Sequence, residues 1–147
     1  MESGGGFDQL EEVVLGACSG QVEWPARIAA GIYAGVNFAI ANPGIVEGLY
    51  PDVEGEAKNM ARYDRIIARF TGFLQMEAPI EARRPGSTDV ALVGGIVGLV
   101  GDHLRLGRTD RLAELRPDLV LLVLLPYLGF EEAKSWAERS DPGPLTI

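Results

Sequence analysis

The chain has 147 residues, of which 47% are hydrophobic and 23% charged, values typical of one globular domain and not of a disordered chain. Acidic residues outnumber basic ones by 21 to 13, which gives a formal net charge of −8. Because duplex DNA is held mainly by cations on its phosphates, we expect no DNA binding by this chain alone. The single cysteine, Cys18, excludes an intramolecular disulfide and is typical of the reducing cytoplasm.

The sequence shows no pattern typical of a secretory signal or of a membrane-spanning helix. Residues 1–6 lack the basic and apolar regions of a secretory signal, so we expect a flexible leader there. The longest apolar run, residues 119–128, is too short to span a bilayer. We therefore expect a cytoplasmic protein without membrane contact, with one helical domain over residues 7–136 and a tail over 137–147.

In the first half of the chain, apolar residues recur every three or four positions, which predicts amphipathic helices. Pro25 suits the first turn of a helix, where its missing N–H costs nothing. Asn42 precedes Pro43 and is therefore disfavoured in the helical conformation, so the helix that begins at Pro25 is expected to end there. The expected helices cover residues 7–17, 25–41 and 53–76, with a short turn at 45–49.

The second half predicts two more helices, over residues 88–106 and 118–128. The first of them contains the glycines Gly94, Gly95, Gly98 and Gly101. Four helical glycines together cost about 3–4 kcal/mol relative to alanine, and close approach of another helix is the usual compensation. The second helix is apolar nearly all round, so it must be covered on every face, in part by a second subunit.

Four segments of this half resemble the last two helices of TetR-family transcription regulators. These segments are residues 92–100 (LVGGIVGLV), 106–108 (LGR), 112–120 (LAELRPDLV) and 124–129 (LLPYLG). The opening at residues 24–27 (WPAR) and the stop at Asn42 and Pro43 resemble the same family's effector-binding domain. The resemblance covers the chain from about Phe7 onward, and it rests on hydrophobic patterns without any catalytic signature.

The resemblance implies an all-α fold: an antiparallel helical bundle of the TetR C-terminal type that dimerises through its last two helices. In such proteins these helices pair across a two-fold axis as a four-helix bundle. Family members begin with a helix-turn-helix head of about fifty residues, and we expect the present sequence to lack it. The predicted homodimer interface consists of Gly94, Val97, Gly98, Gly101, Leu121, Leu124, Leu125 and Leu128.

Helical bundles place small-molecule sites between facing helices, and the resemblance implies an effector site among helices 25–41, 53–76 and the start of 88–106. The inward stripes of these helices carry few polar groups, so a small apolar effector is expected. The predicted ligand-binding residues are Tyr33, Asn37, Met60, Tyr63, Ile67, Phe70, Ile96 and Leu99.

The residues do not favour an enzyme or a metalloprotein. His103 is the only histidine and Cys18 the only cysteine, so no His-rich or Cys/His metal site can be drawn. Gly94, Gly95 and Gly98 do not follow a strand, which a phosphate-binding loop requires. We therefore expect no catalytic residue, no metal and no cofactor.

Two functions of different classes fit these expectations. The first is the effector-sensing and dimerisation domain of a TetR-like regulator, in which a ligand shifts the equilibrium between two conformations. The second is a stand-alone interaction or apolar-cargo protein that heterodimerises with full-length relatives. A helical enzyme with an unrecognised site is a weaker third alternative.

Overall fold

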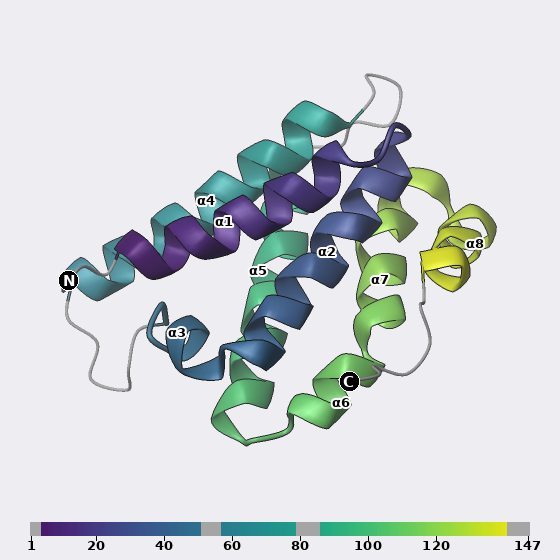
Figure 1. Ribbon diagram of the computed structural model, residues 1–147. Helices are drawn as coiled ribbons and strands as arrows, with labels where there is room; N and C mark the ends of the chain where they lie inside the picture. Colours follow the sequence, from purple (N-terminus) through teal and green to yellow (C-terminus); the bar gives the residue numbers. More distant parts are fainter. Residues whose placement is uncertain (1–3, 51–56, 79–85, 141–147) are drawn as a thin grey trace.

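The computed structural model describes residues 4–50, 57–78 and 86–140, and their regular secondary structure is entirely helical (Figure 1). The helices are α1 (Gly4–Ser19), α2 (Trp24–Ala41), α3 (Pro43–Glu47), α4 (Ala57–Glu77), α5 (Gly86–Arg105), α6 (Thr109–Glu114), α7 (Arg116–Leu128) and α8 (Phe130–Ser140). This confirms the predicted all-α class. Within the described ranges no helix combines the length and the apolar character needed to cross a membrane.

Helix α2 is the centre of the arrangement and contacts α1, α3, α5, α6, α7 and α8. In Figure 1 it lies between the pair α1 and α4 on one side and the pair α7 and α8 on the other. Pro25 stands in its first turn, as expected. At its C-terminus, Asn42 donates hydrogen bonds to the Phe38 carbonyl from its backbone N–H, at 2.8 Å, and from its side-chain amide, at 3.1 Å. Both groups satisfy a carbonyl that the helix end leaves open.

The first and fourth helices run side by side (Figure 1). The rings of Phe7 and Phe70 meet edge to face with centroids 5.8 Å apart. Nearby, Arg69 and Glu11 form an ion pair at 2.6 Å. These contacts join the beginning of the chain to a helix that starts about fifty positions later.

A well-packed core joins α2, α7 and α8. Trp24 and Tyr127 meet edge to face at 5.3 Å, and Trp136 and Ala133 of α8 are buried beside them. The Tyr127 hydroxyl donates a hydrogen bond to the buried carboxylate of Asp89 on α5. This interaction fixes the beginning of α5 against the end of α7.

The helices differ from those expected in three places. Helix α1 begins at Gly4, inside the stretch expected to be a leader, and α8 extends to Ser140, into the expected tail. Helix α6 was not expected at all. Gly129, with φ of 85°, makes the turn between α7 and α8 that glycine alone adopts readily. The predicted start at residue 53 lies outside the described residues.

Candidate functional site

A cavity of about 170 Å³ lies between α1, α2, α4 and α5. Among the described residues that line it, none has a charged side chain, and only Cys18, Tyr50 and Tyr63 carry a polar side-chain atom. The cavity is therefore suited to an apolar molecule, because an ion would lose its hydration without gaining a partner.

Two glycines of α2 bring α1 close enough to form one wall. A methyl group at Gly31 would lie 2.8 Å from the Sγ atom of Cys18, and one at Gly35 would lie 3.4 Å from a methyl of Val14. Residues four apart share a helix face, so Gly31 and Gly35 form one shallow groove into which α1 packs. Cys18 is only 1% exposed as a result.

The opposite wall comes from α4 and α5. From α4 it takes Tyr63, Ile66, Phe70, Phe73 and Leu74. From α5 it takes Val93, Ile96, Val97 and Val100. Both sets repeat every three or four residues, which keeps them on one helix face.

Tyr50, three residues after the end of α3, packs against the C-terminal half of α5. Its hydroxyl donates a 2.5 Å hydrogen bond to the carbonyl of Val97. A methyl group at Gly101 would lie 2.6 Å from the Tyr50 ring, so only glycine permits this contact. Burial raises the pKa of Tyr50, and the neighbouring Tyr63 adds to the effect. The ring is therefore a neutral part of the cavity wall.

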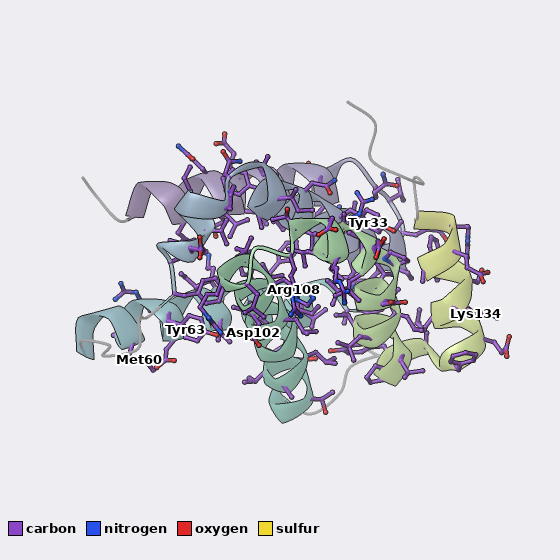
Figure 2. All side chains as sticks on the ribbon, turned by 90° about the horizontal axis from the view of Figure 1, so that it is seen from below. Tyr33, Met60, Tyr63, Asp102, Arg108 and Lys134 are labelled. Atoms are coloured by element: carbon purple, nitrogen blue, oxygen red, sulfur yellow. The ribbon has the colours of Figure 1, made fainter. Side chains whose placement is uncertain are left out.

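Tyr63 lies beside Tyr50, with ring centroids 5.5 Å apart. Burial raises the pKa of Tyr63 above its ordinary value, with a further contribution from the carboxylate of Asp64. Figure 2 shows Tyr63 on α4 next to Asp102 of α5. Its hydroxyl makes no hydrogen bond within the described part of the chain.

Of the eight residues predicted to bind the ligand, Tyr63, Phe70 and Ile96 line the cavity. Ile67 is half-buried, while Met60 and Leu99 are 44% and 38% exposed. Ile66 takes the position expected for Ile67, since neighbouring residues in a helix point about 100° apart.

Tyr33 and Asn37 lie on the opposite side of α2, away from the cavity. The guanidinium of Arg116 lies 5.2 Å from the centroid of the Tyr33 ring and donates a 2.9 Å hydrogen bond to the Asn37 side chain. Figure 2 shows Tyr33 far from Tyr63. Ile32 and Val36, which directly precede these two, are among the residues of α2 that line the cavity.

The cavity also has walls that the sequence reasoning missed. The predicted ligand-binding residues do not include Val14 and Cys18 of α1, Gly31 and Gly35 of α2, or Tyr50. The four-residue spacing of the α2 glycines was a usable signal of close helix packing.

The predicted interface residues fall into two groups. Val97 lines the cavity, Gly101 contacts Tyr50, and Leu124 is 0% exposed, so these three are occupied within the chain. Of the other five, Leu125 is exposed, Gly94 and Gly98 are half-buried with open space beside them, and Leu121 and Leu128 are half-buried and pack against the core of α2, α7 and α8.

We call the outer surface of α5 and α7 the outer face. It consists of Val90, Gly94, Gly95, Gly98, Leu99, Leu122 and Leu125. A methyl group at Gly94, Gly95 or Gly98 would meet nothing within 4 Å. Helices α5 and α7 contact one another.

The described residues contain no cluster of three or more His, Cys, Asp or Glu side chains that could hold a metal ion. Nδ1 of His103 lies 2.8 Å from the Leu99 carbonyl of its own helix. Comparisons with protein-family models, curated proteins and solved structures found no match. The function is therefore inferred from the cavity, the outer face and the sequence pattern.

Proposed function

We propose that this chain is a ligand-sensing and dimerisation domain, of the kind found in TetR-type transcription regulators, and that it binds a small apolar effector in the cavity. The observation that carries the proposal is the cavity itself. Protein interiors are close-packed, with few voids larger than a water molecule. A space of about 170 Å³ lined by apolar side chains is larger than such voids.

A bound apolar ligand would fill this space. Contacts that the walls lack when the cavity is empty are restored by an apolar molecule of matching shape. A space of this size among apolar side chains therefore favours a binding function.

The outer face supports the second half of the proposal, a symmetric homodimer. Val90, Leu122 and Leu125 are 50%, 39% and 40% exposed. A second copy placed across a two-fold axis would cover these side chains with their own counterparts. It would also bring a helix against the bare backbone of Gly94 and Gly98.

Helix α5 offers a route between the two sites. Val93, Ile96 and Val97 face the cavity, while Gly94 and Gly98 lie on the outer face. A ligand that binds one position of α5 more tightly than another would change the geometry of the dimer.

The test is thermal unfolding of the full chain with toluene as the probe. A ligand at ~100 times its dissociation constant adds ~2.7 kcal/mol, which raises the melting temperature by roughly 5–10 °C. Val36→Phe places a ring in the cavity and should abolish this shift. Val22→Phe makes the same change at a position that is 94% exposed and should preserve it. An equal shift in both variants, or none in the wild type, argues against the cavity as the binding site.

A further inference from the structure

The lining of the cavity is elongated. On α4 it runs from Tyr63 to Leu74, and on α2 it runs from Ile28 to Ala39. Each stretch covers about 16 Å of helix at ~1.5 Å per residue. Because the described lining is apolar apart from the thiol of Cys18 and the hydroxyls of two tyrosines, this shape suits a hydrocarbon chain that lies along the helices.

One end of the cavity is closed by the core that joins α2, α7 and α8. Ile28, Leu74 and Val123 line the cavity there, and they are only 6%, 5% and 3% exposed. All three belong to the buried cluster that contains Trp24 and Tyr127. A ligand cannot extend past this end without separating close-packed side chains.

The other end of the cavity reaches the surface of the molecule. Tyr63 lines the cavity there and is half-buried, and Met60, one turn earlier on α4, is 44% exposed. Figure 2 shows Tyr63 between Met60 and Asp102 of α5. Because the cavity is open to solvent and its opposite end is closed, this end is the mouth.

The mouth carries exposed charges of both signs. Asp64, Arg105 and Asp102 interact electrostatically with Tyr63, and all three are exposed. Arg105 also forms an ion pair with Asp102. Exposed charges are screened by water and salt and contribute little to binding, so a polar group of either sign can stay hydrated beside them.

We infer that the cavity takes the hydrocarbon chain of a single-chain amphiphile, whose polar head group stays in water at the mouth beside Tyr63. The inference rests on the proposed function and specifies the class of its effector. The chain supplies the affinity through the apolar area that it buries, and the head group sets the direction in which the ligand lies. Affinity should therefore depend on the length of the chain and hardly on the charge of the head group.

Titration calorimetry on the full chain tests this with butanol, hexanol, octanol, octanoate and octyltrimethylammonium as probes. Each added methylene should tighten binding of the alcohols about threefold to fourfold. The three octyl probes should bind within about tenfold of one another, because their head groups stay hydrated. Val36→Phe should weaken octanol binding at least about tenfold, whereas Val22→Phe, at a position that is 94% exposed, should leave it unchanged.

A nitroxide attached to the head group of an octyl chain tests the orientation of the ligand. Its unpaired electron should broaden the methyl resonance of Met60, at the mouth, more than the methyl resonances of Val123, at the closed end. The reverse order would overturn the placement of the head group.

The outcomes separate this inference from the proposed function. Octanol that binds no more tightly than butanol would overturn the inference, as would charged octyl probes that bind more than about tenfold more weakly than octanol. An unchanged octanol affinity in Val36→Phe would place the chain outside the cavity and overturn it as well. Toluene binding in the cavity can survive each of these results. If neither toluene nor octanol binds, the proposed function fails and this inference fails with it.

Discussion

The two faces of α5 differ in what they contact. Its inner face, with Val93, Ile96 and Val100, lines the cavity. On the outer face, Gly94 and its neighbouring glycines adjoin open space. Helix α5 therefore lies between the cavity and the apolar outer face. A shift of α5 would change the shape of both.

Two glycines one turn apart show the same contrast. Gly101 is required by the Tyr50 ring, which lies 2.6 Å from the position of a methyl group there. At Gly98 the same group would meet nothing within 4 Å. Glycine in a helix costs ~1 kcal/mol relative to alanine, and only at Gly101 does a contact within the chain explain that cost. The proposed dimer would explain Gly98 through contact with a partner helix.

The largest expected effect is on association. Leu125→Arg would place a charge at the centre of the proposed interface, and we expect the dimer dissociation constant to rise at least ~100-fold, or about 3 kcal/mol. Leu15→Arg makes the same change at a similarly exposed site on α1, 37% against 40%, and should leave the dimer intact. Sedimentation velocity measures both. A wild-type chain that is monomeric at micromolar concentration would contradict the proposed homodimer.

The next effect is on the stability of the monomer. Gly101→Ala must displace the Tyr50 ring and break its hydrogen bond to Val97, which outweighs the gain in helix propensity, so we expect a net loss of about 2 kcal/mol. Gly98→Ala, introduced together with Leu125→Arg to keep the chain monomeric, should gain about 1 kcal/mol.

Urea unfolding gives both values. Equal losses at the two positions would mean that the outer face is already covered within the chain. In the wild-type background, Gly98→Ala should instead weaken the dimer, since its methyl group would enter the interface.

The smallest effect concerns pH. The pKa of Tyr50 is raised above its ordinary value of 10.0 in the folded chain. Below pH 10 the phenol is neutral in both states, so its contribution is fully present there. Above pH 10 the unfolded chain loses the proton first, and the free energy of unfolding should fall by up to ~1.4 kcal/mol per pH unit. Tyr50→Phe should fall less steeply between pH 10 and 11, and an identical slope would place Tyr50 in contact with water.

Hydrophobic periodicity predicted that these segments are helical, but it did not fix the rotation of each helix. Tyr33 was expected in the cavity, which Ile32 lines instead, and Ile67 was expected where Ile66 lies. Each error is one residue, or about 100° around the axis. Apolar residues on both sides of a helix permit either rotation, and tertiary packing decides between them.

Hydrophobic periodicity could not predict the contacts between segments that are distant in the sequence. Tyr50 meets Val97 and Gly101 across about fifty positions, and nothing in the local sequence around Tyr50 indicates a partner. Helix α8 could have been predicted, since Ala133, Trp136 and Ala137 are buried at helical spacing. The sequence analysis predicted no helix after the one over residues 118–128.

Methyl NMR during a toluene titration tests the central claim, a ligand on the inner side of α5, most directly. The account predicts that shift changes concentrate on methyl groups of the cavity, at Val36, Ile96 and Val100. It predicts smaller changes for Leu122 and Leu125 of the outer face. Changes confined to Leu122 and Leu125, with the cavity methyls unmoved, would contradict it and place the apolar site on the surface.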